Sequence, residues 1–178
     1  MLKLASLRKL IEQCLPELQR EPERLKVAGQ DGRIVATGTA ALSFEYHYTA
    51  AVVVLDYSGH TDALIVPILA WMQVNQPEQF DNPALREQAI GFQIEHLNDA
   101  SADIGIWLEL TERAIVRPDP NAPADAPRRL TITHPDEPAL VGAPALPEHW
   151  ELWLRDQQKL AEWDIAPPPA RAWFRPAL

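Results

Sequence analysis

The sequence contains little cysteine and little glycine, and each shortage excludes a class of protein. Cys14 is the only cysteine among 178 residues, so no disulfide can form within the chain and a reducing compartment is expected. Cys14 follows other apolar residues at helical spacing, which is typical of a small core residue and not of a nucleophile. The seven glycines are not clustered, which argues against a glycine-rich phosphate loop.

Basic residues are also in deficit, and this limits the possible partners. The chain has 16 Lys and Arg against 25 Asp and Glu, a net charge of −9. Duplex DNA is bound through clustered cations, so we expect no sequence-specific nucleic-acid binding. The longest apolar run, residues 63–72, is shorter than the roughly 18 residues of a membrane span. Because the N-terminus also lacks the pattern of a signal peptide, we expect a soluble protein made inside the cell, without membrane contact.

Proline divides the chain into two parts. Five of the 17 prolines precede Arg117 and the other twelve follow it. Residues 1–117 are therefore predicted to form the folded domain. Residues 118–178 are predicted to be a proline-rich extension with short strands or a hairpin, which docks on its own domain or on a neighbouring subunit.

Residue periodicity predicts two main helices and a set of strands. The first helix covers residues 6–14, and the second, residues 61–74, is apolar nearly all round, Leu69 included, so it should be the most buried element. The strongest strand is 43–56, whose two faces should both be covered near its end, at Val53 and Leu55. Further strands are predicted at residues 25–28, 33–37, 89–97, 103–117 and 129–133.

Two local details accompany these strands. Asp31 and Gly32 favour a hairpin turn between residues 25–28 and 33–37. Ile90, Phe92 and Ile94 are expected to face the core. The order of elements indicates an α+β fold, in which a small, mainly antiparallel sheet has its helices packed on one face and carries a proline-rich C-terminal arm.

Patterns typical of catalysis or metal binding are weak. The histidines lack metal-ligand spacing, and Glu45 with His47 is more typical of a solvated strand face than of a metal site. Glu109 and Glu112 are three apart in a strand, so they point to opposite faces and cannot flank one bond. The run 111–113 interrupts an apolar alternation, which indicates a bulge or a polar contact. We therefore predict no catalytic, metal or cofactor-binding residue and no enzymatic activity.

Aromatic residues gather near the C-terminus: Trp150, Trp153, Trp163, Trp173 and Phe174. Two interpretations remain open. These side chains fold back onto their own domain, or they form a subunit interface, where tryptophan is favoured. Alternation in residues 150–154 favours a hairpin that returns through 160–163, although a helix also fits the spacing.

Five segments taken in order resemble the tail completion protein R (GpR) family of temperate contractile-tailed phages. They are GRIVATG (32–38), LSFEYHYT (42–49), VPILAW (66–71), VNQP (74–77) and LTER (110–113). The resemblance covers roughly residues 7–117 and returns weakly around 149–163.

The resemblance implies a structural role in a phage tail or an R-type tail-like bacteriocin. Proteins of this kind cap the head-proximal end of the tail, stop tube growth and prepare head joining, and related terminators form rings, commonly hexamers. The implied partners are further copies of the chain, tail tube and sheath proteins, and head–tail connector proteins. Assembly would take place in the bacterial host cytoplasm. The alternative is an assembly adaptor or chaperone that is absent from the finished particle.

A ring through which DNA passes should have an acidic or neutral wall, because a basic wall would hold phosphates. Glu45, Glu109 and Glu112, which are expected at exposed strand positions, are candidates for this wall. The alternative interpretation is that these acids only keep the outer surface soluble.

Overall fold

The computed structural model describes residues 1–36, 38, 42–98, 100–121, 123, 127–135, 137, 148–155 and 157–165. Its helices are α1 (Leu2–Cys14), α2 (Pro16–Arg20), the 3-10 turn η1 (Pro22–Arg24), α3 (Asp62–Asn75), α4 (Glu78–Asp81) and α5 (Pro83–Arg86). Its strands are β1 (Leu25–Ala36), β2 (Phe44–Tyr57), β3 (Ile90–His96), β4 (Ala102–Pro118), β5 (Leu130–Thr133), β6 (Glu148–Leu154) and β7 (Gln158–Ile165). None of these helices is long and apolar enough to cross a membrane.

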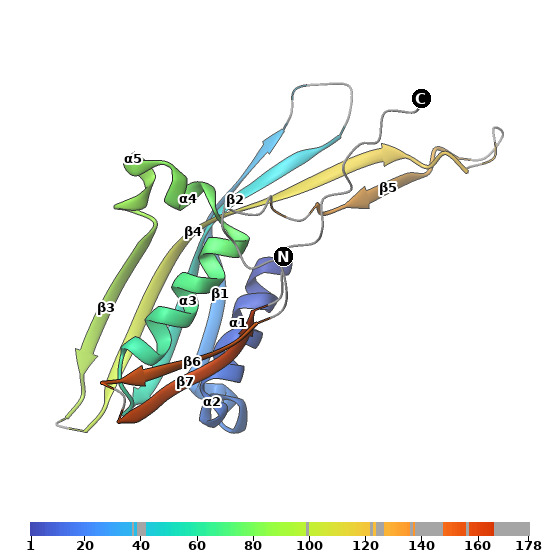
Figure 1. Ribbon diagram of the computed structural model, residues 1–178. Coiled ribbons are helices and arrows are strands. Elements are labelled where there is room, and N and C mark those ends of the chain that lie inside the picture. The colour runs from blue at the N-terminus through green and yellow to red at the C-terminus, as the bar shows by residue number, and fades with distance from the viewer. Residues whose placement is uncertain are drawn as a thin grey trace.

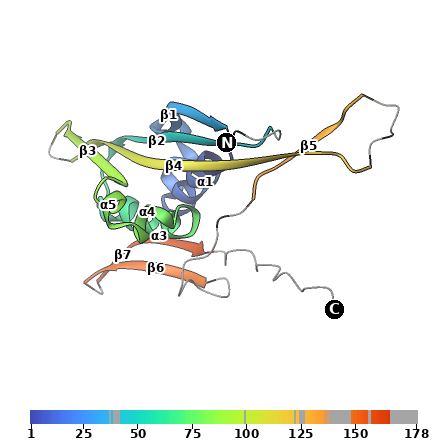
Figure 2. The same cartoon turned by 90° about the horizontal axis from the view of Figure 1, so that it is seen from above.

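The elements form three layers (Figures 1 and 2). The first is an antiparallel sheet in the order β1-β2-β4-β3, with β5 pairing with the far end of β4. The helices lie on one face of this sheet, and the β6–β7 hairpin lies on the other side of the helices (Figure 2). This arrangement confirms the predicted α+β fold with helices on one face.

The core lies between the central strands and the helices. Ile104, Ile106 and Leu108 alternate along β4 with exposed fractions of 2% or less, as a strand with one buried face requires. From the helix side, Ile68 and Met72 of α3 are fully buried. The apolar helix predicted at residues 61–74 is therefore part of the core, as expected.

The β6–β7 hairpin covers the helices from the other side. Ala161, Trp163 and Ile165 of β7 belong to the same buried cluster as α1 and α3. The side chain of Gln13 donates a hydrogen bond to Asp164 at 2.9 Å. The predicted hairpin is confirmed, and it docks on its own chain. Residues 138–147 and 166–178 of the expected extension lie outside the described residues, and the division at residue 117 stays a prediction.

Residues 25–36 form one continuous strand, so the hairpin expected at Asp31 and Gly32 is wrong. Asp31 does adopt a positive φ of 52°. In place of a turn, the strand has a bulge between Gln30 and Arg33, and on both sides of the bulge it pairs with β2. Because β2 is long enough to pair with both halves, tertiary pairing overrides the local turn preference.

Three positions expected in the core are not covered. Phe92 pairs with Ile106 and so lies on the helix-facing side, yet 66% of it is exposed because the helices do not extend over the edge strand β3 (Figure 1). Leu55 is 40% exposed, so the second face of β2 is open rather than covered. Leu69 is only half-buried, because α3 does not bury its whole circumference.

This difference within α3 can be measured. Ile68→Ala should lower the free energy of unfolding by about 2–5 kcal/mol, because it leaves a cavity in a fully buried site. Leu69→Ala, one position along the same helix, should cost clearly less. Urea unfolding of both variants tests this, and equal losses would contradict the layer arrangement.

Candidate functional site

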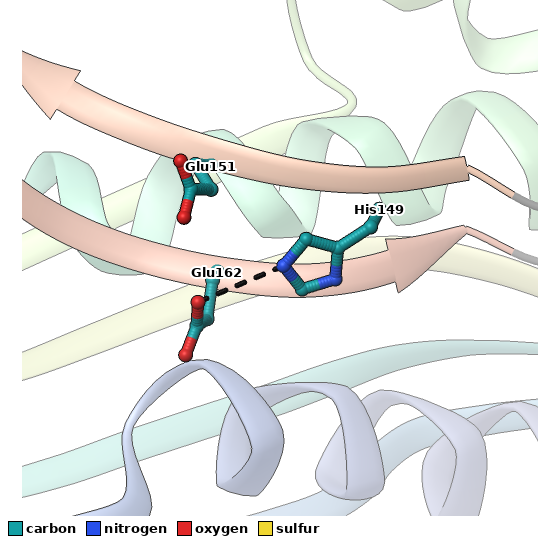
Figure 3. A group of neighbouring side chains, drawn as sticks. All are labelled: His149, Glu151 and Glu162. Atoms are coloured by element: carbon teal, nitrogen blue, oxygen red, sulfur yellow. Dashed lines mark ion pairs between the residues drawn. The ribbon is translucent and has the colours of Figure 1, made fainter.

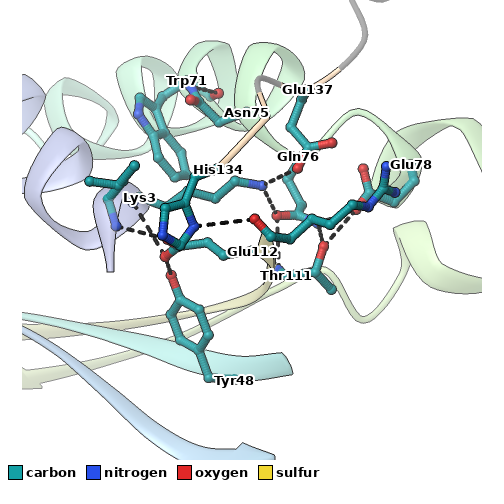
Figure 4. A network of polar contacts seen from close by, with 12 residues as sticks. Lys3, Tyr48, Trp71, Asn75, Gln76, Glu78, Thr111, Glu112, His134 and Glu137 are labelled. Carbon is teal, nitrogen blue, oxygen red and sulfur yellow. Dashed lines mark hydrogen bonds and ion pairs between the residues drawn. The ribbon is translucent and has the colours of Figure 1, made fainter. Parts of the chain in front are cut away.

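A buried polar network lies where α1, α3, β2 and β4 meet (Figure 4). Its centre is Glu112, which is only 4% exposed and continues the buried face of β4. The carboxylate accepts hydrogen bonds from the backbone N–H groups of Leu2, at 2.7 Å, and Lys3, at 3.3 Å. These belong to the first turn of α1, where N–H groups have no partner within the helix and the helix dipole favours a negative charge. A strand carboxylate therefore caps this helix.

Tyr48 of β2 completes the surroundings of Glu112. Its hydroxyl donates a hydrogen bond to the Glu112 carboxylate. Burial raises the pKa of Tyr48 above its usual range, and the neighbouring Glu112 raises it further. The phenol therefore remains a protonated donor, and one carboxylate links α1, β2 and β4.

Gln76, at the C-terminal end of α3, is fully buried and bonds to the edge of β4. Its Oε1 accepts from the Thr111 backbone N–H at 3.1 Å, and its Nε2 donates to the Thr111 hydroxyl at 2.9 Å and to the Glu78 carboxylate. Pairing with β3 ends just before this point, where the Glu109 N–H donates to the Ala89 carbonyl at 3.2 Å. The amide side chain therefore takes the place of a neighbouring strand.

The same edge of β4 is taken up again by β5. Arg129 and Thr131 bond to the backbone of Asp119 and Arg117, whereas Ser43 next to β2 bonds to that of Val116. Successive residues of a strand direct their backbone groups to opposite edges, so β5 lies on the edge away from β2, which is also the edge of β3. This edge is bonded in turn by β3, by Gln76 and by β5.

Lys3 connects the network to the segment after β5. Its Nζ donates to Gln76 Oε1 at 2.8 Å and forms an ion pair with Glu137 at 2.9 Å. His134 lies nearby, with its Nδ1 3.2 Å from the Arg113 carbonyl oxygen. The adjoining cleft, about 120 Å³, is smaller than the several hundred Å³ typical of small-molecule sites. Each of the charged side chains Lys3, Glu78, Glu112 and Glu137 is hydrogen-bonded or ion-paired to a neighbour, so the arrangement is suited to holding elements together.

The three acids predicted to line a channel divide between the two faces of the sheet. Glu45 and Glu109 lie on the face away from the helices, where Glu109 accepts from the Thr49 hydroxyl at 2.8 Å and Glu45 is 3.4 Å from His47. Glu112 lies on the opposite face and is buried, so its expected exposed position is wrong. The polar run 111–113 does make the polar contacts that it indicated. Whether Glu45 and Glu109 line a channel stays a prediction.

The C-terminal tryptophans also divide. Trp163 is 2% exposed, and Trp150 is half-buried with its ring centroid 6.0 Å from that of Trp163. These two fold back onto their own chain. Trp153 is 47% exposed, which leaves it accessible to a neighbouring subunit. Trp173 and Phe174 lie outside the described residues.

One exposed group on the β6–β7 hairpin has the composition of a metal site. Ligand atoms of His149, Glu151 and Glu162 lie within 4.8 Å of one another (Figure 3). However, the Lys159 ammonium is 2.7 Å from Glu162 and 3.4 Å from Glu151. His149 also bonds to Asp164 at 2.9 Å, which raises the pKa of this histidine. We interpret the group as a surface ion-pair network in which lysine supplies the cation.

The sequence-based reasoning missed Glu112 and Gln76 as organising residues. The sequence did contain a signal that Glu112 is buried. It continues the every-second-residue series of Ile104, Ile106, Leu108 and Leu110, so it lies on the same buried face of the strand. A carboxylate on a buried strand face requires donors. The free N–H groups at the start of a helix can supply such donors, and a sequence does not show this as a motif.

Removing this cap should destabilise the protein. Glu112→Ala leaves the N–H groups of α1 and the Tyr48 hydroxyl without their acceptor, so we expect a loss of about 2–4 kcal/mol in the free energy of unfolding. Glu109→Ala, three residues along on the open face, is the matched control and should change it by less than about 1 kcal/mol. Similar values for the two variants in urea unfolding would refute the capping role.

Because a thiol and phenols are buried in this protein, we expect the free energy of unfolding to fall at high pH. Burial raises the pKa of Cys14 from 9.0 to about 12 and that of Tyr57 from 10.0 to about 12. The unfolded chain therefore ionises first, so this contribution is complete below pH 9 and disappears between pH 9 and about 12. Urea unfolding across this range should show a falling free energy, and Tyr57→Phe should reduce the slope. A slope as steep in Tyr57→Phe as in the unmodified chain would contradict the assignment.

Comparisons with known proteins identify the family of this chain. Residues 1–138 match the family model of the P2 phage tail completion protein R (GpR). The tail completion protein R of Escherichia phage P2 is 37% identical over 145 residues, which cover 74% of this chain and 94% of the phage P2 protein. No solved structure matches the chain. Tyr48, Gln76 and Glu112 lie within the segments that carry the resemblance, and by the extent of these matches the chain belongs to the phage tail completion protein R (GpR) family.

Proposed function

We propose that this chain completes a phage tail by capping the head-proximal end of a contractile tail, where it stops tube growth and prepares head joining. The observation that carries the proposal is the extent of the family match. Residues 1–138 include α1 to β5, and thus the whole sheet, the helix layer and the buried network. A relative that is 37% identical is named a tail completion protein, which favours a structural and not an enzymatic role.

The shape of the subunit supports assembly with further copies. Among the described residues, β1 pairs only with β2 and β3 only with β4, so both outer strands have an unpaired edge. Monomeric proteins usually protect such edges. We propose a closed ring, with six subunits as the family resemblance implies, held by contacts between two different surfaces of the chain. Tube and sheath proteins would contact one side of the ring, and head–tail connector proteins the other.

The open face of the sheet is the candidate for a channel wall. By strand register it carries the acids Glu45, Glu95, Asp103 and Glu109 and the bases Lys26, Arg33, Arg113 and Arg117. Such a face is close to neutral overall. A neutral wall would neither hold DNA phosphates strongly nor repel them, which is compatible with passage of DNA.

Particles assembled without this chain test the proposal. Electron microscopy should show tails that lack a finished head-proximal end or vary in length, and supplying the chain should restore joined particles. Antibody labelling of purified particles should place the chain at that end. Tails of normal length joined to heads in its absence would refute the proposal. Restoration with no chain in the purified particles would favour an assembly adaptor or chaperone instead.

A further inference from the structure

Exposed hydrophobic side chains gather at two distant places on the molecule. Among the described residues, eight of the twelve exposed large hydrophobic side chains lie in two regions. The first, here called the arms, comprises residues 33–36 and 42–47 of the β1–β2 hairpin and residues 113–119 and 128–134 of the β4–β5 hairpin. The second, here called the β3 edge, comprises residues 81–98. Figure 2 shows the β4–β5 hairpin and β3 at opposite ends of the sheet.

The arms extend the buried face of the sheet beyond the helices that cover it. Ile34 pairs with Tyr46, and Ile132 pairs with Val116, on the same side as the core residues of β2 and β4. Figure 1 shows both hairpins projecting past the helix layer. Ile34 is 66% exposed, Leu130 42% and Ile132 54%, so this side is an apolar strip without a cover. A partner that covers it would remove apolar surface from water.

The β3 edge also has exposed apolar side chains without a cover. Phe92 is 66% exposed, Leu85 41% and Leu97 47%. The outer edge of β3 also has no partner strand among the described residues. Apolar side chains beside an unpaired strand edge form a surface to which another polypeptide can add.

The two regions carry opposite charge. The arms contain five arginines and two acids, Glu45 and Asp119, which is a net charge of +3 in a chain whose total is −9. The β3 edge contains three acids and Arg86, a net charge of −2. Opposite potentials on two surfaces of one chain favour contact between copies and select the pairing of unlike surfaces.

We propose that the arms of one copy dock on the β3 edge of the next copy. The apolar strip of the arms adjoins Phe92 and its neighbours on the helix-facing side. The arginines on the open face of the arms, Arg113 and Arg117 among them, adjoin Glu95 on the open face of β3. Two different surfaces meet, so the contact is heterologous and, repeated with a constant rotation, closes a ring. The inference deepens the proposed function and rests on it for the biological role of the ring, whereas the contact itself is a property of the purified chain.

The apolar part of the contact is tested on β5 by two neighbouring substitutions. Ile132→Asp places a charge in the apolar strip, and Thr133→Asp places the same charge on the other side of the strand. Both positions are exposed, so both variants should fold with the melting temperature of the unmodified chain. Light scattering should show an oligomer for the unmodified chain and for Thr133→Asp, and the 20.0 kDa monomer for Ile132→Asp. A monomeric unmodified chain at every concentration, or an unchanged mass for Ile132→Asp, would overturn the proposal.

The charged part is tested by a swap. One variant carries Arg117→Glu and Arg128→Glu in the arms, and the other carries Glu87→Arg and Glu95→Arg at the β3 edge. Each variant alone opposes like charges and should be monomeric. Mixed in equal amounts, they offer opposite charges at every contact and should regain the oligomer mass. Arg20→Glu in α2 is the control and should leave the oligomer intact. Failure of the mixture to assemble would exclude the arm-to-β3 pairing.

The Ile132→Asp chain also separates this inference from the proposed function. If particles that contain only this variant complete their tails normally, the arm contact is not the ring contact, while the role in tail completion stands. In the opposite outcome, the unmodified chain forms oligomers that Ile132→Asp abolishes, while particles that lack the chain altogether still complete their tails. In that case the contact stands and the proposed function fails.

Discussion

The capping of α1 by Glu112 is the interaction on which the remainder of this structure depends. A charged carboxylate on the buried face of a strand is unfavourable unless donors surround it. Here the donors are the first N–H groups of α1 and the hydroxyl of Tyr48, so the charge fixes where the helix begins relative to β2 and β4. Lys3, the next residue of the helix, then binds Gln76 and Glu137. One polar centre thereby positions both main helices and the return from the β4–β5 hairpin.

The extent of the helix layer decides which surfaces remain available for assembly. Helices α1 and α3 cover the middle of the sheet, and β6–β7 covers these helices in turn (Figure 2). The strands are longer than this cover at one end, where the arms project, and the sheet is wider than the cover at the edge strand β3, where Phe92 is bare. A subunit with its apolar face uncovered at two ends is stabilised by neighbours. The chain is then folded by its central layers, and its ends are left for contact with other subunits.

Much of the fold could be predicted from the sequence. The alternation of apolar residues along 103–117 and the apolar helix at 61–74 are local patterns that are visible in the sequence. Both elements were predicted correctly to within a few residues. The predicted hairpin at 150–163 was also confirmed. The errors have a common cause. The turn at Asp31, the cover over Phe92 and the exposure of Glu112 depend on elements that lie far away in the sequence.

The sequence by itself determined most of the secondary structure, the fold class and the acidic character of this protein, because periodicity and composition act locally or as sums. Only the tertiary structure decided the partners of individual side chains. From the sequence, Glu112 is expected to be a surface acid. The tertiary structure places beside it the N-terminal end of a helix that lies 109 residues earlier in the chain. From the sequence, Gln76 is expected to be a loop residue. In the structure β3 ends early, and the side-chain amide of Gln76 bonds to the edge of β4 that β3 leaves unpaired. Which apolar residues stay uncovered likewise depends on the length and width of one layer relative to another, and no local pattern contains these dimensions.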